Sequence, residues 1–81
     1  MTDPPAMVRV PAGTTLRLPE GAWRGHGELV LRVGRVMHEL DRHVDPGWVQ
    51  LEGTRLDGEG RRAGHIQACV RVDALEAATR R

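Results

Sequence analysis

The sequence predicts an all-β fold, a small five- to six-stranded barrel with a short C-terminal helical turn. Two observations carry this prediction: short runs of alternating apolar and polar residues recur along the chain, and clusters of glycine, proline and aspartate separate them. The chain has 81 residues, which is enough for one small domain. We expect residues 7–76 to form that domain, between a flexible tail at residues 1–6 and a frayed end at residues 77–81.

The clearest element is a β-hairpin between residues 46 and 72. Its first strand is predicted at residues 48–56, and its second at residues 65–72, where apolar and polar residues alternate. The intervening Asp-Gly-Glu-Gly at residues 57–60 supplies the positive φ angles that a hairpin loop needs. The outer face of this hairpin should carry an aromatic side chain among polar ones: Trp48, Gln50, His65, Gln67, Cys69 and Arg71.

Two further short strands are predicted near the N-terminus, at residues 7–10 and 14–18. Pro-Ala-Gly between them is typical of a turn, and Leu16 and Leu18 should face inward because polar residues flank them.

A glycine-rich loop at residues 19–27 follows these strands and contains Trp23, Arg24 and His26. Loops held by a rigid scaffold often carry binding residues, so Trp23 and Arg24 are candidates for contact with a partner. The competing interpretation, which we favour slightly, is that Trp23 fills the core, because the chain has only two aromatic residues.

A strand bent at Gly34 is predicted over residues 28–39, followed by a loop at residues 41–47. A helix over residues 36–43 is the alternative, because the apolar residues here also fit helical spacing. Glycine, β-branched residues and the lack of an N-cap residue disfavour that helix.

At the other end of the chain, Asp73 with Glu76 three residues later is an acidic form of the capping box. It predicts a short helix over residues 74–78, with Leu75 packed beneath the barrel.

The segments WVQLEG (residues 48–53) and VRVDAL (residues 70–75), with the spacing of the strands, resemble the layout of a Src-homology-3-like small barrel, and less closely that of an OB-fold. The resemblance covers residues 7–75 and includes no diagnostic motif. It implies a peptide-binding module, a nucleic-acid reader or an assembly subunit rather than an enzyme.

The amino-acid composition excludes several kinds of chemistry. The chain has no Lys, Asn, Ser, Phe or Tyr, so it lacks a serine nucleophile, a Schiff-base lysine and a phenolic acid. The same bias indicates a GC-rich bacterial genome, such as that of an actinobacterium. It also makes every basic residue an arginine, while the net charge of +1 argues against a strongly electrostatic binder.

One motif resembles a zinc site without meeting its requirements. HELDRH places His38 and His43 five residues apart, whereas a helical zinc pair needs a spacing of four. A single cysteine, Cys69, excludes an intramolecular disulfide and a thiolate-rich zinc site. His65 lies four residues from Cys69, about 13 Å along a strand, which is too far to activate the thiol.

No signal peptide and no membrane span are recognised, so we expect a cytoplasmic protein. We predict a non-enzymatic accessory or regulatory subunit, without cofactor or metal, that binds a protein partner or a second copy of itself. The candidate binding residues are Trp48, Gln50, His65, Gln67 and Arg71 of the hairpin, and Trp23 and Arg24 of the loop. The alternative is a nucleic-acid-binding barrel with an outward stripe of Arg9, Arg17, Arg32 and Arg71.

Overall fold

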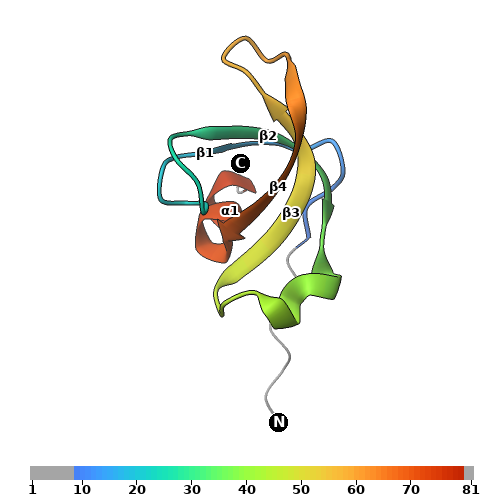
Figure 1. Ribbon diagram of the computed structural model, residues 1–81, viewed down its shortest axis with the longest axis vertical. Coiled ribbons are helices and arrows are strands. Elements are labelled where there is room, and N and C mark those ends of the chain that lie inside the picture. Colours follow the sequence, from blue (N-terminus) through green and yellow to red (C-terminus); the bar gives the residue numbers. More distant parts are fainter. Residues whose placement is uncertain (1–8, 80–81) are drawn as a thin grey trace.

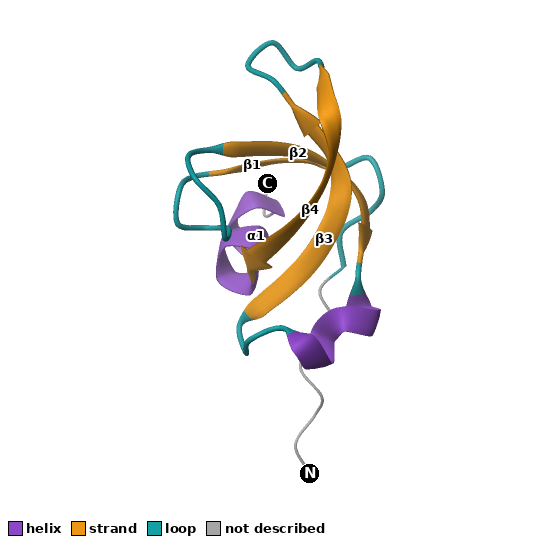
Figure 2. Ribbon diagram, viewed as in Figure 1, coloured by secondary structure: helices purple, strands orange, loops and turns teal. Residues whose placement is uncertain are grey.

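The computed structural model describes residues 9–79, which form one antiparallel sheet and a C-terminal helix (Figures 1 and 2). Four strands lie side by side in chain order: β1 (Thr15–Leu18), β2 (Leu29–Val36), β3 (Trp48–Leu56) and β4 (Arg62–Arg71). A short 3-10 helix, η1 (His38–His43), joins β2 to β3, and α1 (Val72–Thr79) follows β4. The all-β prediction is confirmed, but the described sheet is open and has four strands rather than five or six.

The sheet curls around one core, and α1 lies on its concave side (Figure 1). Alternate residues of each strand face this core, as the period of a β-strand requires. The fully buried side chains come from all four strands and from the helix: Leu16, Leu18, Leu29, Leu31, Val33, Leu51, Val70 and Leu75.

The β3–β4 hairpin is the element that the sequence predicted best. β3 has the predicted limits, whereas β4 begins at Arg62 rather than at residue 65 and ends at Arg71 rather than at residue 72. The loop between the two strands closes through Asp57. The Asp57 carboxylate accepts hydrogen bonds from the backbone N–H groups of Glu59 (2.8 Å) and Arg61 (2.9 Å). Gly60 has φ +80°, which a residue with a side chain adopts at a cost.

Trp23 is a core residue, which confirms the interpretation that we favoured and removes it from the candidate contact surface. The residue is 9% exposed, and its indole N–H donates to the Gly27 carbonyl (2.9 Å). It forms an isolated antiparallel bridge with Val70 at the edge of β4. Gly25 is required beside it, because a Cβ there would come within 2.1 Å of the indole ring.

The region after Gly34 differs from the prediction. A β-bulge interrupts the pairing of β2 with β3 between Val33 and Arg35, which accounts for the expected bend. The strand ends at Val36 rather than at residue 39. The 3-10 helix η1 lies within residues 36–43, where a helix was the alternative prediction, and it occupies part of the predicted loop. Acidic residues in the first turn of η1 and basic residues in its last suit the direction of its backbone dipoles.

Both ends of the domain also need correction. Arg9 and Val10 are not in a strand, although Val10 is buried; residues 1–8, including the predicted tail, lie outside the described residues. The C-terminal helix begins at Val72 and continues to Thr79, so residues 77–79 are helical rather than frayed. Asp73 lies inside its first turn and pairs with Arg71 (2.8 Å) instead of capping the helix.

Among residues 9–79, no helix has the length and apolar character that crossing a membrane requires.

Candidate functional site

The pairing of β3 with β4 places the predicted contact residues on one face of the hairpin. Trp48 lies opposite Arg71, and Gln50 lies opposite Cys69. Their neighbours in sequence, Val49 among them, are buried in the core, so these four side chains face outward. Trp48 is only partly buried there, at the point where β3 begins.

Arg24 covers one face of Trp48, with its guanidinium carbon 4.3 Å from the ring centroid. This distance is within the range of a favourable cation–π contact. The backbone N–H of Arg24 donates to the Cys69 carbonyl (2.9 Å), which fixes the loop against the edge of β4. The guanidinium also forms an ion pair with Asp45, which lies just before β3. Three segments therefore position one aromatic–cation pair.

A pocket adjoins Trp48 on the side of α1. Arg71 and Asp73 form an ion pair at its margin, and Glu76 adds a second carboxylate. The residues that line it come from the start of β3, the end of β4 and the first turn of α1: Pro46, Gly47, Trp48, Arg71, Val72, Asp73 and Glu76. Apolar surface beside opposite charges is suited to a peptide segment that has both an apolar and a polar group.

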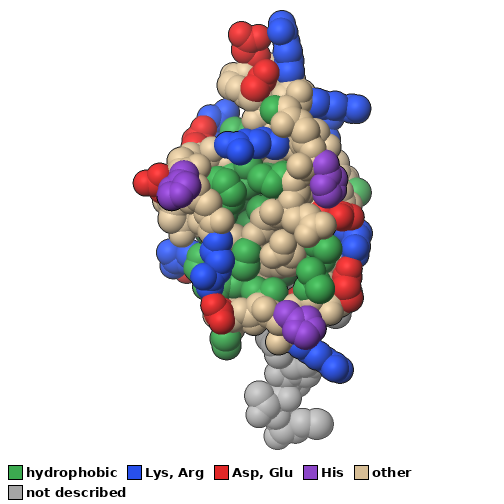
Figure 3. Space-filling view, in the orientation of Figure 1, with side chains coloured by type: hydrophobic (Ala, Val, Ile, Leu, Met, Phe, Trp, Pro, Cys, Tyr) green, Lys and Arg blue, Asp and Glu red, His purple; other side chains and the backbone are tan. Residues whose placement is uncertain are grey.

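Figure 3 shows how side chains are distributed on the face in the view of Figure 1. Apolar side chains are open to solvent near its centre, with arginine, acidic and histidine side chains around the margin (Figure 3). Basic and acidic side chains lie together at the lower left, near the start of β3 (Figures 1 and 3). The molecule thus presents an apolar surface with a charged margin rather than a field of one sign.

His65 shares the outer face of β4 but lies in a separate part of it from Trp48 and Arg71. His65 is six residues from Arg71, about 20 Å along the strand. It lies 3.6 Å from the carboxylate of Glu52 on β3, and it is largely exposed. The structure therefore groups Trp48, Gln50, Arg71 and Arg24. Gln67 lies in the middle of β4, opposite Glu52 and diagonal to Gln50, whereas His65 lies toward the hairpin loop.

The predicted arginine stripe is divided. Arg17 and Arg32 are diagonal neighbours on β1 and β2, whereas Arg71 lies at the other end of the face and Arg9 is outside the strands. Arg17 is paired with Glu28 (3.1 Å), and Arg71 is paired with Asp73.

The strand pairing adds an arginine that the sequence analysis missed. This residue is Arg62. One row across the sheet contains, from β1 to β4, Arg17, Val30, Leu56 and Arg62, so the two arginines lie at its two ends. Neighbouring strands lie about 4.8 Å apart, so the backbones of Arg17 and Arg62 are about 14 Å apart across the sheet. The bulge between Thr54 and Leu56 sets this pairing, and no sequence pattern reveals it.

Among residues 9–79, no three His, Cys, Asp or Glu side chains form a group that could hold a metal ion. His38 pairs with Asp41 (3.3 Å) in η1 rather than with His43. Arg35 binds both Glu39 (2.7 Å) and Glu52 (2.7 Å). Its hydrogen bond to Glu39 lowers the pKa of that carboxyl, and the same two carboxylates raise the pKa of Arg35.

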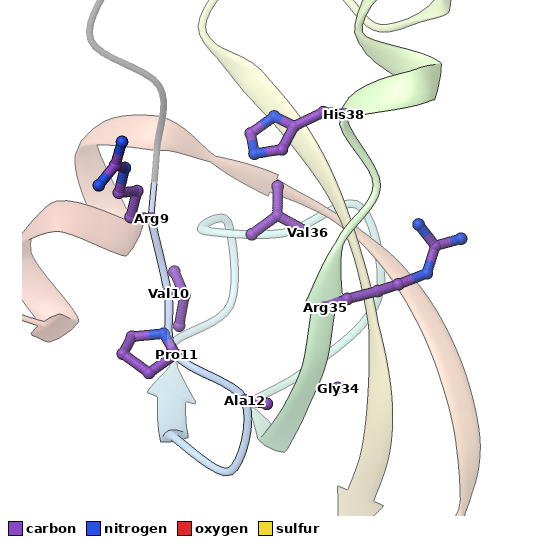
Figure 4. A pocket seen from close by; sticks show the side chains of 8 residues that line it. All are labelled: Arg9, Val10, Pro11, Ala12, Gly34, Arg35, Val36 and His38. Atoms are coloured by element: carbon purple, nitrogen blue, oxygen red, sulfur yellow. The ribbon is translucent and has the colours of Figure 1, made fainter.

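A second pocket lies between the segment before β1 and the end of β2 (Figure 4). Val36 and Val10 point into it, whereas the Arg35 side chain points away toward its carboxylate partners (Figure 4). Its lining contains one histidine, His38, and no acidic residue or cysteine. We therefore assign it no chemistry.

Asp45, Glu52 and Glu76 are site residues that the sequence analysis did not select. Acidic residues in turns and on strands are ordinary, and their partners lie far along the chain: Asp45 binds Arg24, and Glu52 binds Arg35. Each of these two acidic residues meets its arginine partner only in the folded chain.

Comparison of the chain with protein-family models, with curated proteins and with solved structures found no match.

Proposed function

We propose that this protein is a non-enzymatic interaction module that binds a protein partner through Trp48 and the side chains around it. One observation carries the proposal: a partly exposed tryptophan, stacked with Arg24, lines a pocket together with apolar and charged side chains. Tryptophan and arginine are the residues that most often dominate the free energy of protein–protein binding. Such modules serve as accessory or regulatory subunits, and we propose this role in a GC-rich bacterium.

The rigidity of the site supports the proposal. Asp45 and the backbone of Cys69 hold Arg24 in place, and β3 holds Trp48. A partner that contacts such a surface loses less conformational entropy than one that must order it. The buried bridge between Trp23 and Val70 adds residues 22–24 to the curled sheet. We propose that the sheet and this segment together act as a Src-homology-3-like small barrel.

The proposal predicts that Trp48→Ala strongly weakens binding and leaves the fold intact. Binding should weaken at least about 30-fold, since central tryptophans commonly contribute 2 kcal/mol or more. The measurement is a pull-down from a lysate of the source organism with wild-type and variant protein, followed by mass spectrometry and titration of the identified partner. Circular dichroism must give the same β-rich spectrum for both proteins.

A matched control separates the proposal from its alternative, in which Arg17, Arg32 and Arg62 bind a nucleic-acid backbone. The double variant Arg32→Gln/Arg62→Gln changes the outer sheet and leaves Trp48 unchanged. Nuclease treatment and this double variant should not affect capture of a protein partner. Capture that depends on nucleic acid and on these arginines, and that survives Trp48→Ala, would replace the proposal with the alternative. Unfolding of Trp48→Ala would make Trp48 a core residue instead.

A further inference from the structure

Among residues 9–79, no strand or loop pairs with the first half of the β4 edge that faces away from β3. Ile66, Ala68 and Val70 direct their backbone groups toward β3, and the odd-numbered residues direct theirs to the opposite edge. The second half of that edge is already paired. The Cys69 carbonyl accepts a hydrogen bond from the Arg24 N–H, and the Arg71 N–H donates to the Ala22 carbonyl (2.9 Å each). Within residues 9–79, Val70 is the one β4 residue recorded in a bridge on that side.

The unpaired part of this edge is short and bounded on both sides. After Arg24 the chain turns away, with the Gly25 N–H donating to the Trp23 carbonyl (3.0 Å). At the other side, a bulge interrupts the β3–β4 pairing, and Gly64 has φ +105°. Between these limits lie residues 64–68, with the N–H and C=O groups of His65 and Gln67 facing outward.

We propose that two copies of the chain associate through this edge, with their β4 strands antiparallel about a two-fold axis at Ile66. Exposed strand edges are templates for pairing with another strand, and charged residues or proline commonly prevent it. Residues 64–68 contain neither a charged Lys, Arg, Asp or Glu nor a proline.

A second copy fits this edge because the segment is complementary to itself. The two-fold axis places His65 opposite Gln67 of the second copy, so each pair can exchange two backbone hydrogen bonds. It places Ile66 opposite Ile66 of the second copy, in the closely spaced type of pair. Ile66 is partly buried and packs against the core, so the contact would extend that core into the second copy. Because residues 64–68 contain no Lys, Arg, Asp or Glu, this register does not place like charges of these residues opposite each other.

The boundaries of the segment are also complementary. In this register, Gly64 of one copy lies opposite Ala68 of the other. The next residue would meet Arg24, which already occupies the edge at Cys69. On the other side of the segment, the bulge bends β4 before Gly64. The five residues that can pair in this register are therefore the same five whose outer edge is unpaired within the described part of a single chain. The surface is distinct from that of Trp48, and the inference is independent of the proposed function.

The test is sedimentation velocity of the whole chain at concentrations from about 10 μM to 1 mM. We expect a reversible dimer that dissociates on dilution, because a five-residue strand contact is at the small end of specific interfaces. Gln67→Pro should raise the dissociation constant at least tenfold, since it removes an outward N–H and places a ring at the contact. Proline is tolerated at an edge strand where the N–H faces solvent, so the fold should remain.

Gln67→Ala is the matched control, because it removes the same side chain and keeps the N–H. It should dimerise like the wild type. A wild-type chain that stays monomeric at 1 mM overturns the proposal, and so does equal dimerisation of Gln67→Pro and Gln67→Ala.

Cross-linking provides a second measurement that does not depend on proline. In a Cys69→Ala background, Ile66→Cys places two thiols on residues whose Cα atoms are about 4.5 Å apart in this register, within the range of a disulfide. Mild oxidation should produce a covalent dimer, whereas Glu76→Cys on α1 should produce little. Equal cross-linking of the two variants would exclude the two-fold register, and the proposal with it.

Discussion

At Gly53, two strands pass too close together for any side chain. A Cβ there would lie 2.1 Å from the Arg32 carbonyl oxygen and 2.9 Å from the Leu31 side chain. The first of these atoms belongs to the backbone of β2, so the clash can be relieved only by moving a strand. Glycine at this position is therefore required by packing, without any special φ angle.

Gly53→Ala should destabilise the fold by about 1–3 kcal/mol or more, the usual cost of overpacking a core. Gly58→Ala is the control, because a Cβ at Gly58 meets no atom within 4 Å and the residue has no positive φ. It should change the free energy of unfolding by less than about 0.5 kcal/mol. Urea denaturation of both variants, followed by circular dichroism, measures the difference. Similar midpoints for both would show that β2 can shift at little cost.

The two tryptophans show what residue-level inference from sequence could and could not predict. Both lie near glycine and arginine, so local composition does not separate a core residue from a surface one. The difference comes from distant contacts: Val70 pairs with Trp23, and Arg24 with Asp45 covers Trp48. We expected Trp23 to be buried because the chain has only two aromatic residues and a small core needs large side chains. That argument concerns the core as a whole and not the local sequence around Trp23.

At the scale of elements, prediction succeeded where the signals are local. β3 and β4 have alternating patterns and a turn sequence between them, and both patterns act over a few residues. The strand predicted to continue to residue 39 was wrong beyond Val36, because apolar spacing over residues 36–43 fits both a strand and a helix. The helix that we kept as the alternative forms in part, as η1. The structure forms a 3-10 turn, which has neither period and in which no residue is buried. The strand predicted at residues 7–10 failed in its described part, since Val10 is buried without pairing.

The C-terminal helix depends on one side chain for its position. An eight-residue helix is marginal in isolation, so its stability must come from packing. Leu75 is fully buried beneath the sheet and is the one buried residue of α1, whereas its neighbour Glu76 is exposed. The sequence predicted this contact correctly, although the capping that it inferred from Asp73 was wrong.

Leu75→Ala should therefore reduce the free energy of unfolding by about 2–5 kcal/mol, the range for a buried leucine. For a domain of this size, the change is a large part of the total stability. Glu76→Ala is the control on the next residue and should have a small effect. Thermal unfolding measures both, and a loss below about 1 kcal/mol for Leu75→Ala would mean that α1 does not complete the core.

At the scale of the whole molecule, the sequence predicted the class of the fold but not the way the sheet is completed. Composition and alternation predicted a small β domain, and the structure is one. The contact that brings residues 22–24 to the edge of β4 depends on a loop without a regular pattern. The same contact positions Arg24 over Trp48, so the candidate site could not be predicted beyond its hairpin residues. Within the described part of the chain, no segment pairs with the rest of the β4 edge.

A network of charges ties three elements of the molecule together and should respond to acid. Arg35 of β2 binds Glu39 of η1 and Glu52 of β3. The hydrogen bond from Arg35 holds the pKa of Glu39 below its ordinary value of 4.5. Because the folded pKa is the lower one, this contribution to stability is fully present above pH 4.5 and is lost as the pH falls through the folded value.

Arg35→Gln should therefore flatten the dependence of stability on pH below 4.5, with a small effect near neutrality because the groups are exposed. Thermal unfolding between pH 3 and pH 7 measures this dependence, and a carbon-detected NMR titration follows the Glu39 carboxyl directly. Arg42→Gln removes the same charge from η1, where its guanidinium forms no ion pair within residues 9–79. It should leave both the slope and the Glu39 titration close to those of the wild type. If the Glu39 pKa does not rise in Arg35→Gln, Arg35 is not what stabilises the carboxylate, and the link between β2 and η1 rests on the backbone alone.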